Sequence, residues 1–80
     1  MAYLVEFHMG PEPAHPEWTH FATRADLSPP PIGTPCSVNT DRPLRGLEEG
    51  EPVTGYVERL EYLEQAGSHI YRVMLSPGPR

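Results

Sequence analysis

The last third of the chain, residues 51–76, constrains the fold more than any other segment. Tyr56–Ala66 contains neither glycine nor proline, Gly67 and Ser68 interrupt it, and the apolar segment His69–Leu75 follows. This order indicates a folding unit made of an amphipathic element, a stop and a strand. The rest of the chain is broken repeatedly by proline, which interrupts both helices and strand ladders.

We predict that residues 52–66 form a helix. Their apolar side chains recur at i, i+3, i+4, i+7 and i+10, whereas Glu58 and Glu61 fall on the opposite side. Pro52 suits the first helical position, and Gly67 suits the left-handed position that follows a helix. β-branched residues and a glycine near the start are poor helix formers and weaken this prediction. The apolar stripe consists of Val53, Tyr56, Val57, Leu60 and Leu63.

The alternative for the same segment is a β-hairpin. Gly55–Glu64 would pair with His69–Leu75 across the turn at residues 65–68, where Gly67 would be the left-handed residue. That arrangement resembles the tail of a small all-β SH3-like barrel. We prefer the helix, because a regular strand would mix apolar and charged residues on one face. Those residues are Val57, Arg59, Glu61 and Leu63.

Three earlier segments are predicted to be strands. Ala2–Met9 alternates between two faces, Glu17–Arg24 is rich in aromatic and β-branched residues, and Thr34–Val38 is a shorter candidate. Together with His69–Leu75, they predict an α+β domain: a small, mostly antiparallel sheet of about four strands with the helix packed on it. Residues 1–76 would form this single compact domain, and residues 77–80 a flexible tail.

Two irregularities refine the strand prediction. Trp18 and Phe21 share one face of a strand only if a bulge lies near His20. His69–Leu75 is apolar on both faces, which is typical of a central strand or of an edge strand covered by a partner.

Chain length favours self-association. The core of a domain of 80 residues is marginal, and the one cysteine excludes an intrachain disulfide. A second chain is the remaining common source of stability, so we expect a homodimer. The lone thiol, the absence of a secretory leader and the lack of a long apolar run predict a cytoplasmic protein without a membrane span.

The charge pattern excludes several function classes. All six basic residues are arginines, so chemistry that needs a lysine amine, such as a Schiff base or a phosphate-binding P-loop, is absent. The formal net charge is −5 and the arginines are scattered along the chain. Since nucleic-acid binding needs clustered positive charge, we predict no nucleic-acid partner.

Three histidines are the candidate metal ligands. His8, His15 and His20 fall within 13 residues, with Glu12 and Glu17 between them. Imidazole and carboxylate groups suit zinc and other transition metals. A hairpin of the first two strands would bring His8 and His20 together. The spacing matches no known motif, however, and surface histidines are the ordinary explanation.

Cys36 is the other candidate reactive group. A nucleophilic cysteine needs a lowered thiol pKa, whereas a lone cysteine is more often a small buried apolar residue. We therefore predict no catalytic residue and no cofactor.

Binding is the function that the sequence favours. Trp18 lies beside a proline-rich loop, His20 is close to it, and Tyr62 falls on the polar side of the predicted helix. Exposed aromatic residues anchor partners. The sequence predicts a non-enzymatic interaction module that acts as a homodimer on a protein or small-molecule ligand. The alternative is a small enzyme or metal-binding protein that uses His8, His15 and His20, or Cys36.

Overall fold

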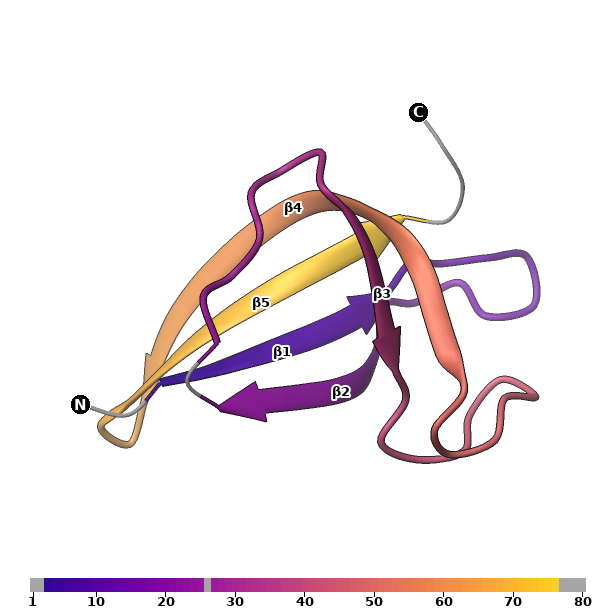
Figure 1. Cartoon of the computed structure of the whole chain (residues 1–80), viewed down its shortest axis with the longest axis horizontal. Helices are drawn as coiled ribbons and strands as arrows, with labels where there is room; N and C mark the ends of the chain where they lie inside the picture. The colour runs from indigo at the N-terminus through magenta and orange to yellow at the C-terminus, as the bar shows by residue number, and fades with distance from the viewer. Residues whose placement is uncertain (1–2, 26, 77–80) are drawn as a thin grey trace.

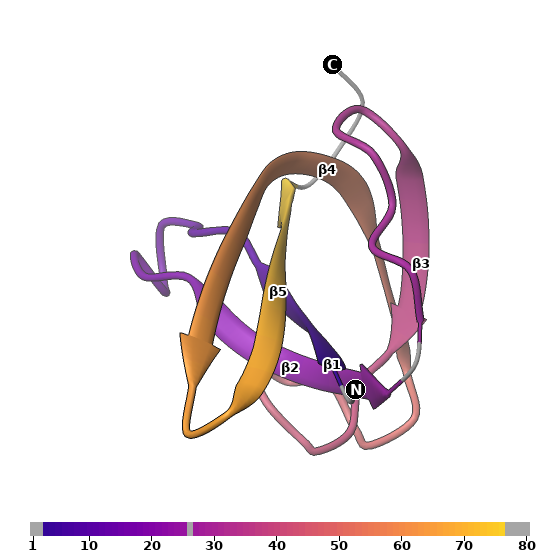
Figure 2. The ribbon, with the colours of Figure 1, turned by 90° about the vertical axis from the view of Figure 1, so that its left-hand side faces the viewer.

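The computed structural model describes residues 3–25 and 27–76, which form one five-stranded sheet. The strands are β1 (Tyr3–Met9), β2 (Thr19–Ala25), β3 (Pro35–Asn39), β4 (Pro52–Gln65) and β5 (Ser68–Ser76). Their order across the sheet is β2-β1-β5-β4-β3. The β1–β5 pair is parallel and the other neighbouring pairs are antiparallel. The sheet curls until β2 and β3 approach each other, which gives a nearly closed barrel (Figures 1 and 2).

The predicted α+β class is wrong. The described residues contain no helix, and residues 52–65 belong to the longest strand of the sheet. The small all-β barrel, which was the alternative, is the class that the structure supports. Ala2 and the predicted tail, residues 77–80, lie outside the described residues.

A β-bulge explains why the apolar residues of β4 have the spacing of a helix. Val57 pairs with Leu75 and Arg59 pairs with Met74, so Glu58 is an extra residue in β4. The bulge reverses the alternation of side chains, and residues 53, 57 and 60 all pack toward the core. Their spacing of i, i+4 and i+7 is the helical one. The bulge also sends Arg59 to the opposite face from Val57, so the objection to a strand no longer holds for Val57, although Leu63 still shares a face with Arg59 and Glu61.

The turn between β4 and β5 is a two-residue hairpin loop. Gln65 pairs with Ser68, and the intervening Ala66 and Gly67 have φ of 50° and 82°. Positive φ at both positions is typical of a type I′ turn, whose twist matches that of the strands it joins. The left-handed role predicted for Gly67 in the hairpin alternative is therefore confirmed.

The bulge predicted near His20 is present, but it does not place Trp18 and Phe21 on one face, since Phe21 lies in the core and Trp18 contacts Arg59 on the outer face. In the β1–β2 ladder, Phe7 pairs with Ala22 but His8 pairs with His20, which leaves Phe21 as the bulged residue. Phe21 and Ala22 are consequently both buried. β5 lies at the centre of the sheet, between β1 and β4, as its two apolar faces predicted.

The core fills the inside of the barrel. The alternate residues Val5, Phe7 and Met9 of β1 face inward, and Val73 and Leu75 of β5 join them. Burial of these apolar side chains is the main favourable contribution to folding.

A few backbone and side-chain hydrogen bonds, rather than a strand ladder, bridge the seam between β2 and β3. Asp41 is the central residue: its N–H donates to Phe21 O at 2.9 Å, and its carboxylate accepts from Thr23 N at 2.9 Å. Arg24 also donates to this carboxylate at 2.8 Å and to Asn39 O at 3.0 Å. The edge of β2 is thus partly satisfied without a pairing strand.

Candidate binding site

An aromatic cluster lies on the inner face of the sheet. The bulge at Glu58 places Tyr62 on this face, opposite Tyr71 of β5. The parallel β1–β5 pairing brings Tyr3 opposite His69. Residues from the two ends of the chain thus meet here. We call Tyr3, Tyr62, His69 and Tyr71 the tyrosine cluster.

The four rings contact one another in sequence. The ring centres of Tyr62 and Tyr71 are 5.0 Å apart with planes at 48°, and those of Tyr62 and His69 are 5.8 Å apart and stacked. Tyr3 meets Tyr71 edge to face, at 5.9 Å and 86°. The Tyr62 hydroxyl donates a hydrogen bond to Nδ1 of His69 when that nitrogen is unprotonated. Rings held in this way form a defined surface rather than a set of independent side chains.

The cluster lines an open pocket. Its volume is about 510 Å³, and Pro29, from the connection between β2 and β3, contributes to the lining. Tyr62 remains 53% exposed in spite of its two aromatic neighbours, His69 and Tyr71. A ligand could therefore contact the rings without a rearrangement of the sheet.

The surroundings of Tyr62 favour the neutral form of its hydroxyl. Partial removal from water raises the pKa of the Tyr62 hydroxyl, and the Glu64 carboxylate and the nearby Tyr71 raise it further. Glu64 stands two residues from Tyr62 on the same strand and pairs with His69. The site thus disfavours negative charge.

Comparison of the chain with models of protein families, with curated proteins and with solved structures finds no match. Function has to be inferred from the residues themselves.

Trp18, a predicted binding residue, lies away from the tyrosine cluster. It is half-buried just before β2, and the guanidinium of Arg59 lies 5.8 Å from its ring centre. Met74, which pairs with Arg59, is only 5% exposed although it points away from the core. Trp18 and Arg59 thus form a cation–π contact with each other on the outer face of the sheet, within the protein itself.

His20 and His8 meet on the outer face, as a hairpin of β1 and β2 requires. Their rings stack with centres 5.0 Å apart. His20 Nε2 lies 2.7 Å from Thr23 Oγ1, and His8 Nε2 lies 3.2 Å from a Glu6 carboxylate oxygen. Burial lowers the pKa of His8, although the bond to Glu6 acts against this shift.

The third predicted metal ligand is not part of this pair. His15 lies in the turn between β1 and β2, where its backbone forms a two-way bridge with Glu12. Within residues 3–25 and 27–76, no group of three or more histidine, cysteine, aspartate or glutamate side chains is placed to hold a metal ion. Of the three predicted metal ligands, the structure therefore brings only His8 and His20 together.

Cys36 lies on β3 and packs against the core. Burial raises the pKa of its thiol, and Sγ lies 3.8 Å from Thr34 O. A nucleophilic cysteine needs the opposite shift, since the thiolate is the reactive form.

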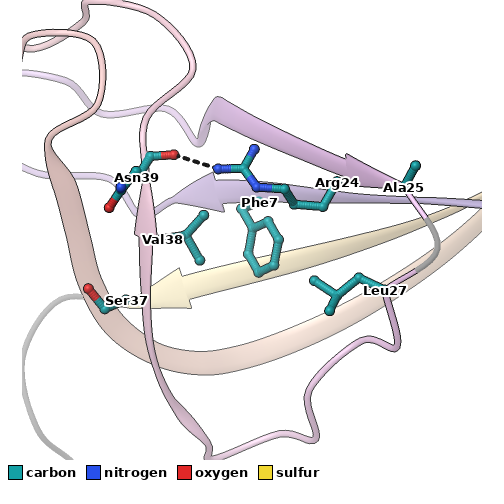
Figure 3. A pocket seen from close by; sticks show the side chains of 7 residues that line it. All are labelled: Phe7, Arg24, Ala25, Leu27, Ser37, Val38 and Asn39. Carbon is teal, nitrogen blue, oxygen red and sulfur yellow. Dashed lines mark hydrogen bonds between the residues drawn. The ribbon is translucent and has the colours of Figure 1, made fainter.

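A second pocket, also of about 510 Å³, opens at the seam between β2 and β3 (Figure 3). Among the described residues that line it, Arg24 is the one cation, and it reaches across the pocket to Asn39 O. Since Arg24 is also paired with Asp41, its charge is already compensated. This pocket therefore belongs to the closure of the barrel and offers no free charge to a ligand.

Of the four residues in the tyrosine cluster, Tyr62 was predicted from the sequence to bind a partner, whereas Tyr3, His69 and Tyr71 were not. Tyr3 and Tyr71 are inward members of alternating strands, which made them look like ordinary core residues. The detectable signal was the hairpin alternative, in which Tyr62, His69 and Tyr71 lie near one another across the turn. The contribution of Tyr3 depends on the parallel pairing of the first and last strands.

Proposed function

We propose that this protein is a non-enzymatic binding module whose ligand surface is the tyrosine cluster. The observation that carries this proposal is the 53% exposure of Tyr62 within a group of four contacting rings. Aromatic side chains contribute a large contact area at low entropic cost, and tyrosine is enriched at binding hot spots.

The site supports binding better than catalysis. The raised pKa values of Tyr62 and Cys36 keep both groups in their protonated, less nucleophilic forms. Glu64 lies on the same face of β4 as Tyr62 and acts on it by its charge. These features provide a surface with defined shape and potential, and that is what a binding module needs.

A peptide panel tests the proposal. Lysine-rich, proline-rich and acidic peptides are each titrated into ¹⁵N-labelled protein, and amide shifts are recorded. We expect at least one peptide to shift the amides of Tyr62, His69 and Tyr71 and to lose its effect in Tyr62→Ala. Tyr56→Ala, which removes a half-buried tyrosine of the same strand outside the cluster, is the matched control. The proposal is contradicted if no peptide shifts these amides, or if the same shifts occur in the Tyr62→Ala variant.

We also propose that the module acts as a homodimer in the cytoplasm. β5 is central and both its edges are paired, so a partner has to use another part of the sheet. In the described residues, β3 pairs with β4 only up to Tyr56, and the backbone of Gly33 and Thr34 bonds Val57. Residues 59–65 at the far edge of β4 have no partner strand among the described residues, and such an edge can accept a second chain.

Light scattering tests self-association directly. A mass of two chains at tens of micromolar protein is the expected result, and Leu63→Pro on the far half of β4 should reduce it if the edge is used. A monomer mass at that concentration would show that the barrel is stable as a single chain.

No described helix is long and apolar enough to cross a membrane.

A further inference from the structure

The orientation of the rings suits a positively charged ligand. Tyr3 and Tyr71 stand at 86° to each other, and Tyr62 is inclined at 48° to Tyr71. The pocket is therefore bordered by ring planes in several orientations. A cation is attracted to the electron-rich face of an aromatic ring, and several rings around one site form an aromatic cage for alkylammonium groups.

The charges around the pocket favour the same kind of ligand. Glu64 lies two residues from Tyr62 on β4, and its charge is felt at the Tyr62 hydroxyl. Among the described residues, no arginine lines the pocket. The chain as a whole carries a formal net charge of −5, so long-range attraction also favours a cationic partner.

Within residues 3–25 and 27–76, no arginine side chain lies in the pocket. Each arginine within the described residues is engaged elsewhere: Arg24 with Asp41, Arg42 with His20 O, Arg45 with Gly10 O, Arg59 with Glu61 and Arg72 with Glu6. Among the described residues, no arginine is left free to occupy the pocket, so the pocket can accept a cation from a partner.

The openness of the pocket indicates that the cation belongs to a larger molecule. Small-molecule sites usually enclose most of the ligand surface, whereas Tyr62 is left about half exposed here. An open site of this kind can hold one side chain while the rest of the partner stays outside.

From these observations, and resting on the binding function proposed above, we infer that the tyrosine cluster binds the alkylammonium side chain of a partner protein. This side chain is a lysine in an exposed segment of the partner. A methylated lysine would fit better, because its apolar methyl groups match the aromatic rings. The Tyr62 and Tyr71 faces contact the cation, and Glu64 supplies the opposite charge.

The experiment compares isosteric peptides. One short peptide carries lysine, a second carries trimethyllysine, and a third carries the neutral analogue in which carbon replaces the quaternary nitrogen. Affinities are measured by calorimetry and amide shifts at about pH 8, above the range in which histidine is usually charged. We expect trimethyllysine to bind about tenfold more tightly than the neutral analogue.

Variants identify the groups responsible. Tyr62→Ala should abolish detectable binding, while Tyr62→Phe, which keeps the ring face, should retain it within about threefold. Glu64→Gln should weaken the cationic peptides several-fold and leave the neutral analogue unchanged. Tyr56→Ala should bind as the unchanged protein does, and amide spectra of each variant establish that it is folded.

Other outcomes separate the two proposals. Equal affinity for the neutral analogue, or binding of a proline-rich peptide alone, would overturn the cation inference and leave the binding function standing. Free choline that binds as tightly as the trimethyllysine peptide would overturn the assignment to a partner protein. Failure of every peptide to shift the cluster would refute both proposals.

Discussion

Gly55 allows the backbones of β4 and β5 to approach closely. A Cβ atom built on this residue would overlap the backbone carbonyl oxygen of Ser76 and touch the Leu75 side chain. Unlike the tip of a flexible side chain, a strand carbonyl cannot move aside without disturbing its ladder. Glycine is therefore required here for space, within a strand where it would otherwise be unfavourable.

Gly55→Ala should destabilise the protein by about 2–3 kcal/mol, because the added methyl group forces the two strands apart. Urea denaturation monitored by tryptophan fluorescence measures the change. Thr54→Ala, at the exposed neighbouring position, should change the free energy of unfolding by less than about 0.5 kcal/mol. Equal effects of the two substitutions would contradict the steric argument.

Asp41 links the two edges of the barrel through its charge. The N–H of Thr23 and then the guanidinium of Arg24 lower the pKa of its carboxyl below the ordinary value. Because the folded-state pKa is depressed, the stabilising contribution is present above the ordinary carboxyl pKa. It is lost as the pH falls through the folded-state value.

Asp41→Asn should reduce the free energy of unfolding at neutral pH by about 1 kcal/mol, a modest value because the ion pair is substantially exposed. The difference between the two proteins should shrink as the pH falls below about 4. Denaturation midpoints at neutral pH, at about pH 5 and at about pH 3 test this. A difference that stays constant over this range would show that the charge of Asp41 does not contribute.

At the scale of elements, two tight turns share one backbone conformation. Ala66 and Gly67 join β4 to β5, and Arg45 and Gly46 form the equivalent turn between Leu44 and Leu47. Positive φ is costly for a residue with a Cβ atom. Arg45 offsets the cost with hydrogen bonds, whereas Ala66 has only a methyl side chain.

Ala66→Asn should therefore stabilise the hairpin by about 0.5–1 kcal/mol, since asparagine tolerates positive φ and Asn-Gly is the preferred type I′ pair. Thermal denaturation followed by circular dichroism measures the change. Ala14→Asn is the control: Ala14 is exposed in another tight turn, but its φ is not positive. A gain at both positions would point to a general surface effect rather than to the turn.

At the scale of the whole molecule, internal hydrogen bonds hold the connections together. Arg45 donates to Gly10 O at 2.7 Å, to Glu17 O at 2.6 Å and to Thr19 Oγ1 at 2.6 Å, and so joins the connection before β4 to the one before β2. Arg42 donates to His20 O at 2.6 Å. These two arginines are therefore partly used to hold the barrel together.

We accordingly predict no binding of nucleic acid. Labelled duplex and single-stranded oligonucleotides at about 100 mM salt should show no complex at micromolar protein, because a chain with a formal net charge of −5 displaces few counterions. A salt-dependent complex that is lost in Arg42→Ala would reveal a basic surface and contradict the prediction.

The strand positions of β1, β2, β3 and β5 follow from sequence because they depend on neighbouring residues. Alternation of apolar side chains marks Tyr3–Met9, and the imperfect alternation around Phe21 indicates the bulge beside His20. Gly67 marks the turn. Each of these sequence signals lies within a few residues of the strand, bulge or turn that it predicts.

The conformation of residues 52–66 has a different origin. A bulged strand and a helix both place apolar residues at 53, 57 and 60, so local periodicity cannot distinguish them. The pairing with β5, and the close approach at Gly55, favour the strand. The tyrosine cluster is non-local for the same reason. Tyr3 joins His69 and Tyr71 through the register of a parallel ladder, and that register depends on the packing of segments from opposite ends of the chain.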